Sequence, residues 1–296
     1  MSYKIRIISP SGVIEPELVY KSASFLRSRG FDVSISAHAC GSYGRFSGTA
    51  EERLSDLNEA LCDPELDYIL CSRGGYGLVQ IIDRVVVPED RCPTVVGFSD
   101  ITALHNLMGC HGKPSVHGVM CKHIAEYDSR TEAVEQLLHV LTKDTIDYRL
   151  PSHPHNKTGA VEGTIRGGNL SVLYGLQGTP YATPINAGDI LLIEDIGEHP
   201  YAIDRMMHNL RLSGVLSRLG GLIVGQFSDC EEDPRMPYTI YEGIKRLTEP
   251  YNYPVVFNFP AGHVADNRPV ILNREGCILT VDNDKTTLHI PDKKNV

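Results

Sequence analysis

Ser99 is the residue of this chain whose setting best suits nucleophilic chemistry. A short apolar run at 94–97 predicts a buried strand, and apolar residues at helical spacing follow at once over 101–108. Ser99 therefore stands on a tight strand-to-helix turn, where its side chain projects above the sheet edge near the first helical amides, starting with Asp100. The alternative is an N-cap role, which is the more common use of a serine before a helix.

A serine nucleophile needs a base, and two of the twelve histidines stand at strand ends close to glycine. They are His117, before Gly118, and His263, which follows an apolar strand predicted at 255–259. A histidine in such a place is more often structural unless a carboxylate partner orients it.

Glu194 is the candidate partner, because it ends an apolar strand predicted at 190–193, where an acid is costly unless it is hydrogen-bonded. It would hold an imidazole in the right tautomer, as the acid of a Ser-His-acid triad does. Two structural roles compete on equal terms: capping the turn at 195–197 and pairing with Arg205. Asp195 and Glu198 are substitutes for the acid, and the order Ser99, Glu194, His263 is one that triads use.

The glycines Gly74 and Gly75 follow a predicted strand at 68–71. They lack the spacing of a dinucleotide-binding loop and the lysine of a P-loop, so we expect a turn or an oxyanion donor there. A free amide in this loop, beside Ser99, would complete an oxyanion hole with Asp100. Metal-binding signatures and cofactor motifs are missing from the sequence, so we predict neither a metal nor a cofactor.

Strands and helices alternate around these residues through the first half of the chain. Strands are predicted at 3–9, 31–35, 68–71 and 94–97, with helices at 15–29, 50–61, 78–85, 119–125 and 131–141. This rhythm predicts an α/β fold with a mostly parallel sheet, helices on both faces, and a site at the carboxyl ends of the strands.

The sequence pattern changes at 148–158. This segment is polar, interrupted by proline and without periodicity, and we interpret it as a linker. Beyond it, strands are predicted at 160–165, 190–193, 222–226, 255–259 and in short pieces after 268, with helices at 170–176 and 201–213. We therefore expect an α/β domain at 1–147 that carries the nucleophile and a smaller β-rich domain at 159–296 that carries the acid and the histidine.

Composition narrows the class of protein. The 296 residues carry a formal net charge of -9 at pH 7 and no basic run, which argues against binding to nucleic acid. The first apolar run is too short for a signal sequence, and no stretch reaches membrane-spanning length. Eight scattered cysteines fit reduced thiols. We expect a cytoplasmic protein with no membrane contact.

Taken together, the motifs resemble those of the LD-carboxypeptidases, the family of muramoyltetrapeptide carboxypeptidases and of the related microcin-immunity peptidases. The resemblance covers nearly the whole chain. It rests on five short motifs in the family's order: 72–77 (SRGGYG), 97–102 (GFSDIT), 167–171 (GGNLS), 193–195 (IED) with 201–205 (YAIDR), and 259–263 (FPAGH).

The resemblance implies a Ser99, Glu194 and His263 triad, with oxyanion donors at the amides of Asp100 and Gly75. It also implies a Rossmann-like first domain, a β-rich second domain, a site in the groove between them, and a homodimer. The function expected on this basis is a metal-free serine carboxypeptidase that cuts an L-D bond and releases the terminal D-alanine of cytoplasmic murein tetrapeptide during peptidoglycan recycling.

Arg73 or Arg166 is a candidate for gripping the carboxylate of this small peptide, since a guanidinium matches a carboxylate bidentately. Two other functions stay open. One is hydrolysis of a peptidyl or aminoacyl nucleotide, as in the microcin-immunity branch; the other is non-catalytic binding of a muropeptide.

Overall fold

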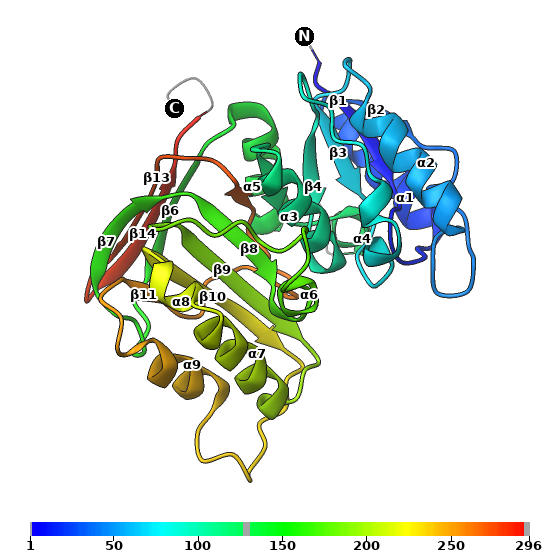
Figure 1. Ribbon diagram of the computed structural model, residues 1–296. Helices are drawn as coiled ribbons and strands as arrows, with labels where there is room; N and C mark the ends of the chain where they lie inside the picture. Colours follow the sequence, from blue (N-terminus) through cyan, green and yellow to red (C-terminus); the bar gives the residue numbers. More distant parts are fainter. Residues whose placement is uncertain (1, 127–130, 293–296) are drawn as a thin grey trace.

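The computed structural model describes residues 2–126 and 131–292, and its first half is built on a six-stranded sheet (Figure 1). The order is β12-β5-β4-β3-β1-β2, and all neighbours but one are parallel. The parallel strands are β1 (Lys4–Ile8), β2 (Asp32–Ile35), β3 (Tyr68–Cys71), β4 (Thr94–Gly97) and β5 (Ser115–His117). The strand β12 (Val270–Leu272) comes from near the end of the chain and runs antiparallel to β5.

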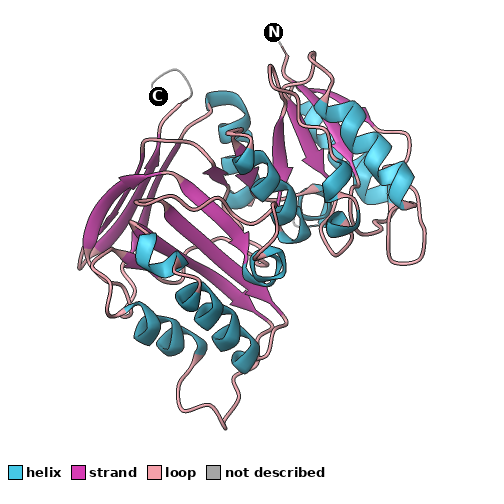
Figure 2. Ribbon diagram, in the orientation of Figure 1, coloured by secondary structure: helices cyan, strands magenta, loops and turns pink. Residues whose placement is uncertain are grey.

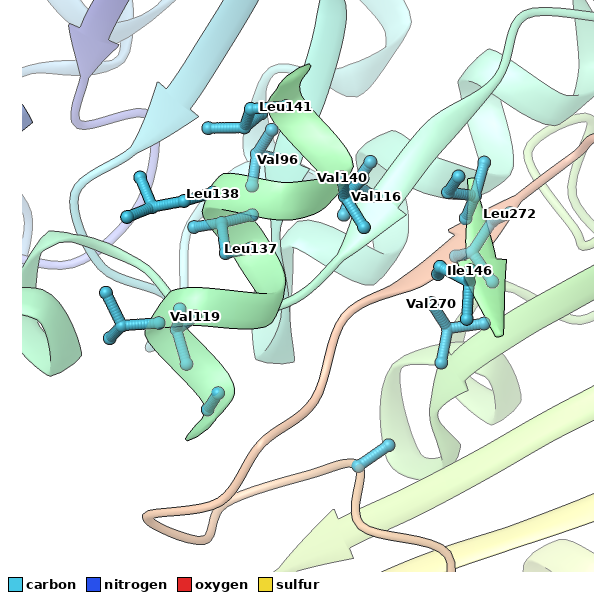
Figure 3. Packing of buried hydrophobic residues seen from close by; sticks show 14 of the residues in the cluster. Val96, Val116, Val119, Leu137, Leu138, Val140, Leu141, Ile146, Val270 and Leu272 are labelled. Carbon is cyan, nitrogen blue, oxygen red and sulfur yellow. The ribbon is translucent and has the colours of Figure 1, made fainter. Parts of the chain in front are cut away.

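Helices cover both faces of this sheet because successive strand residues point to opposite sides. On one face lie α1 (Pro16–Ser28), α4 (Cys121–Glu126) and α5 (Glu132–Lys143), and on the other α2 (Ala50–Leu61) and α3 (Thr102–Cys110). Figure 3 shows leucines of α5 packed toward Val96 of β4 and Val116 of β5. Each such buried aliphatic side chain contributes about 1.5–3 kcal/mol to folding.

The second half contains a parallel sheet and an antiparallel sheet, seen together in Figure 2. The parallel sheet has the order β11-β10-β9-β8, from β8 (Ile165–Asn169), β9 (Ile190–Ile196), β10 (Gly221–Ser228) and β11 (Val255–Val256). Its helices are α6 (Leu170–Leu176), α7 (Pro200–Leu212), α8 (Val215–Arg218) and α9 (Ile240–Thr248), all packed in one apolar cluster. The antiparallel sheet joins β6 (Ile146–Pro151), β14 (Lys285–Ile290), β13 (Cys277–Val281) and β7 (Gly159–Gly163).

This architecture confirms the predicted α/β class, with a Rossmann-like parallel sheet in the first half and a second, β-rich half. The order 2-1-3-4-5 of the parallel strands is that of a doubly wound sheet, which places ligands at the carboxyl ends of the strands near the point where the order reverses. One apolar cluster includes Val96, Leu192 and Leu279, and therefore runs through all three sheets.

Several segments differ from prediction: α9 was not predicted, and the strand expected at 255–259 is only the two residues of β11. The helix expected at 78–85 is two 3-10 turns, η1 (Leu78–Gln80) and η2 (Ile82–Arg84), because the chain leaves helical geometry at Ile81, whose φ and ψ are -127° and -8°. The amide of Leu78 donates to Asp100 Oδ2 at 2.9 Å. The expected linker, 148–158, begins inside β6, whose Ile146 and Tyr148 are buried and alternate with exposed Asp147 and Arg149.

The domain limits at 147 and 159 stay a prediction, and the outer ends of both expected domains lie outside the described residues. Across the described ranges, the helices are all too short or too polar to cross a membrane. All eight cysteines fall within those ranges, and no disulfide joins any two of them.

Candidate active site

Ser99 lies on a strained turn between β4 and α3. Its φ angle is 66°, a left-handed conformation that a non-glycine residue adopts at a cost of about 1–3 kcal/mol and that clusters at functional sites. It opens the 3-10 turn η3 (Ser99–Ile101), which runs into α3, and the cap position of this turn is occupied by Phe98 rather than by Ser99. The N-cap role is therefore not what the structure shows, and the geometry is that of a nucleophile elbow.

The loop after β3 lies against this turn. A Cβ atom built on Gly74 would stand 2.6 Å from Cβ of Ser99 and 2.9 Å from its Oγ, so glycine alone allows this close approach. Gly75 follows with a φ of 106° and is exposed. The amide of Asp100 belongs to the first helical turn, where amides have no acceptor within the helix. Asp100 thus follows Ser99 directly, and Gly75 follows the glycine that contacts Ser99, while the role of both amides as oxyanion donors stays a prediction.

Gly74→Ala is expected to lower kcat/KM about 100-fold, because the added methyl group must displace the Ser99 side chain and a misplacement of about 1 Å has that cost. Steady-state kinetics on purified protein would measure it. The matched control is Gly175→Ala on α6, where the methyl group meets nothing within 4 Å: it should keep activity and gain up to about 1 kcal/mol in stability. Equal activity of the two variants would contradict the close approach.

A buried polar network fixes the loops around Ser99. The Asp100 carboxylate accepts from Ser11 Oγ and from the Leu78 amide. The guanidinium of Arg53, which is 1% exposed, donates to the carbonyl oxygens of Pro10 (2.9 Å) and Gly77 (3.0 Å). Sequence reasoning missed this network, since nothing in a helical arginine signals burial.

Glu194 and His263 form a hydrogen-bonded pair. Glu194 lies near the end of β9 with a fully buried side chain, and His263 Nδ1 is 2.9 Å from its Oε2. Gly262 permits this contact, since a Cβ there would lie 3.0 Å from the same oxygen. The His263 side chain is 16% exposed, so its other nitrogen is within reach of a ligand. The structure therefore brings together the predicted acid and the predicted base.

The other candidate histidine, His117, lies near the second oxygen of the same carboxylate. Its Nε2 lies 3.7 Å from Glu194 Oε1, and its side chain has no solvent exposure. Burial alone would raise the pKa of Glu194, but the two flanking histidines lower its pKa to about 2, so the carboxylate is ionised at neutral pH.

The rings of three histidines surround Phe98, the residue before Ser99. The ring centroid of Phe98 is 4.8 Å from that of His263, 5.1 Å from that of His123 and 5.7 Å from that of His117. Through His263, Phe98 is thus one of the contacts between the second half and the turn that carries Ser99.

Asp195 has a different role from Glu194, because neighbouring residues of β9 face opposite sides. Its carboxylate accepts from Asn169 Nδ2 (2.9 Å) and from the Ser171 amide (2.8 Å), at the start of α6. Burial, with the charge of Glu194 nearby, raises the pKa of Asp195 to about 6. The predicted alternative of a Glu194 ion pair with Arg205 is also wrong: the Arg205 guanidinium lies over the ring of Tyr201 at 5.5 Å.

The unfolding free energy is expected to decrease as the pH falls from about 6.5 to about 3. Burial lowers the pKa of His105 from 6.5 to about 3, and the flanking histidines lower the pKa of Glu194 from 4.5 to about 2. In this range the unfolded chain binds more protons at these sites than the folded protein, which favours unfolding in acid. Asp195 opposes this trend between pH 3.8 and about pH 6, because its pKa is raised and the folded protein binds the proton more tightly there.

Urea unfolding at several pH values would measure this decrease. Repeating the series at high salt is the control, because salt screens surface charges and affects buried groups much less. A stability that is flat or rises on acidification would contradict the assignment.

The two predicted substrate-binding arginines lie in different places. Arg73 is exposed in the loop beside Ser99 and donates to the carbonyl oxygen of Val13 at 2.7 Å. Arg166 stands near the start of β8, where it is held by Asp189 (2.6 Å) and Asn273 (3.2 Å). It also lies beside the last turn of α3, roughly 15 Å along that helix from Ser99. The role of Arg166 as a substrate clamp stays a prediction, which its ion pair with Asp189 and its distance from Ser99 do not favour.

Comparison with known proteins agrees with this geometry. Family models of the LD-carboxypeptidase N-terminal and C-terminal domains match residues 5–118 and 162–278. The chain is 33% identical to a putative carboxypeptidase of Streptomyces coelicolor, over 88% of this chain and 85% of that protein. It is 30% identical to the murein tetrapeptide carboxypeptidase of Pseudomonas aeruginosa, over 90% of this chain and 89% of that protein.

The fold comparison gives the same answer. The crystal structure of the muramoyltetrapeptide carboxypeptidase from Oxalobacter formigenes matches with a TM-score of 0.87 and 29% identity, covering 98% of this chain and 99% of that one. The chain therefore belongs to the LD-carboxypeptidase family.

Proposed function

We propose that this protein is a metal-free serine LD-carboxypeptidase that releases the terminal D-alanine of murein tetrapeptide. The observation that carries the proposal is the strained Ser99 turn, which lies beside a Glu194–His263 pair through the contact of Phe98 with His263. The murein tetrapeptide carboxypeptidase of Pseudomonas aeruginosa supports the substrate.

In this mechanism the Ser99 hydroxyl attacks the carbonyl carbon of the L-D peptide bond while His263 takes its proton. The hydrogen bond to Glu194 occupies Nδ1 of His263, which leaves Nε2 to act as the base. The amides of Asp100 and Gly75 donate to the oxyanion of the tetrahedral intermediate, an interaction worth about 2.7–4 kcal/mol per donor. His263 then gives the proton to the departing D-alanine amine, and water hydrolyses the acyl-enzyme by the same steps.

Arg73 is the proposed partner of the substrate's terminal carboxylate. It is exposed in the loop that contacts Ser99, and its bond to Val13 leaves donors of the guanidinium for a ligand. We further propose that the enzyme is cytoplasmic, that it works as a homodimer, and that its substrate comes from peptidoglycan recycling.

The test is release of D-alanine from purified murein tetrapeptide, with and without a chelator. We expect D-alanine release that the chelator does not reduce, and no release of the terminal L-alanine from a tetrapeptide that ends in L-alanine. A folded protein that releases no D-alanine would contradict the proposal, and assays on peptidyl and aminoacyl nucleotides would follow. Loss of release in the chelator would contradict the metal-free mechanism.

A further inference from the structure

A second histidine lies near the oxygen of the Glu194 carboxylate that His263 does not contact. His117 ends β5, Glu194 lies near the end of β9, and both side chains have no solvent exposure. The carboxylate thus lies between two imidazoles that come from different halves of the chain.

The polar atoms between His117 and Glu194 are otherwise unsatisfied. Within the described ranges, Oε1 of Glu194 and both ring nitrogens of His117 are buried without a hydrogen-bond partner. Leaving an ionised oxygen of this kind unpaired is costly, and the nearest donor is Nε2 of His117 at 3.7 Å. Catalytic contacts are often this long without substrate and shorten when it binds.

We propose that His117 is a positioning residue that donates from Nε2 to Oε1 of Glu194 and thereby fixes the carboxylate for its bond to His263. A carboxylate held at one oxygen can rotate about its side-chain torsions, whereas one held at both oxygens presents Oε2 to His263 in one orientation. His117 has no exposure and is not itself a base for the substrate. The inference rests on the proposed serine mechanism.

The other histidines nearby do not share this role. His105 donates from Nε2 to the carbonyl oxygen of Gly97 at 2.9 Å, and its ring centroid is 6.5 Å from that of His117. The ring of His123 contacts the ring of Phe98. His105 is therefore the matched control, a buried histidine of the same region whose ring nitrogen is held by a backbone oxygen.

The first test is a double-mutant cycle on D-alanine release. His117→Met, of similar size and without a donor, is expected to lower kcat about 10- to 100-fold with KM unchanged, the effect of losing a hydrogen bond to a charged group. His117→Gln, whose amide nitrogen can replace Nε2, should retain most activity. In a Glu194→Ala background, which removes both carboxylate oxygens and is assayed at high enzyme concentration, His117→Met should change kcat less than twofold, whereas His105→Gln should have the same effect in both backgrounds.

An equal loss from His117→Met in both backgrounds would overturn the proposal, since a purely structural role does not depend on Glu194. Unchanged kcat in His117→Met would overturn it as well. Thermal unfolding of each variant shows that the comparison is made between folded proteins.

Imidazole ¹⁵N NMR of the unsubstituted protein tests the same contact without changing His117. A proton on Nε2 of His117 is expected, and a proton on Nδ1 alone would overturn the proposal. This measurement does not depend on catalysis. Absence of D-alanine release by the unsubstituted enzyme would therefore contradict the proposed function, and the tautomer would still decide the role of His117.

Discussion

Ser99→Ala is expected to reduce D-alanine release by about 10³- to 10⁶-fold, the range seen when a triad nucleophile is removed from a serine hydrolase. The alanine methyl group cannot attack the peptide carbonyl, while the loop that contacts it and the Glu194–His263 pair stay in place. The loss should fall on kcat, with KM little changed, because substrate contacts away from Oγ remain. The measurement is single-turnover release of D-alanine at high enzyme concentration.

Two further observations make the Ser99 result specific. Ser55→Ala, on the exposed side of α2, should keep full activity. Because alanine cannot take a left-handed φ more easily than serine, Ser99→Ala should not become more stable by relief of strain. Release at the original rate in Ser99→Ala would mean that another group is the nucleophile.

Glu194→Gln is expected to lower kcat by about 10⁴-fold, as in triads whose acid is replaced by its amide. The amide NH₂ group can face Nδ1 of His263 and favour the tautomer with its proton on Nε2, so the imidazole no longer has a free base nitrogen toward Ser99. The buried charge that stabilises the imidazolium is also lost. Steady-state kinetics would show the change as a fall in kcat.

The control for Glu194→Gln is Glu198→Gln, which changes the nearby acid that the sequence offered as a substitute. Glu198 lies in the turn after β9 and is partly exposed. The activity of the Glu198→Gln variant should therefore stay within about threefold of the unsubstituted enzyme, as expected of a surface site. A large loss in Glu198→Gln with little loss in Glu194→Gln would reverse the assignment of the acid.

Local patterns were sufficient for much of the fold. The helix at 50–61 agrees with prediction because its signals are local: Thr49 accepts from the Glu52 amide, and Glu52 accepts from the Thr49 amide in return. The strand at 68–71 agrees because it is a short, fully buried run. The prediction for 78–85 failed because apolar spacing alone does not distinguish a regular helix from two short 3-10 turns, and no proline or glycine in this segment marks the break at Ile81.

The candidate site was predicted in its residue types and less well in its contacts. Alternation along β9 shows that Glu194 and Asp195 face opposite sides, but the sequence does not say which side meets the histidines. His117 and His263 differ in solvent exposure, and the place of Arg166 is set by its ion pair with Asp189. Both are tertiary properties, which the sequence does not show. The catalytic roles of Ser99, Glu194 and His263 stay predictions.

The pairing of β12 with β5 has a consequence for synthesis of the enzyme. Val270 pairs with His117, so the last part of the chain completes the sheet that carries Ser99, and it does so soon after His263. Domains fold as the chain emerges, amino-terminal part first. A nascent chain that stops before His263 lacks the proposed base, and one that stops before Val270 leaves the edge of β5 open, so we expect ribosome-bound and prematurely terminated chains to be inactive.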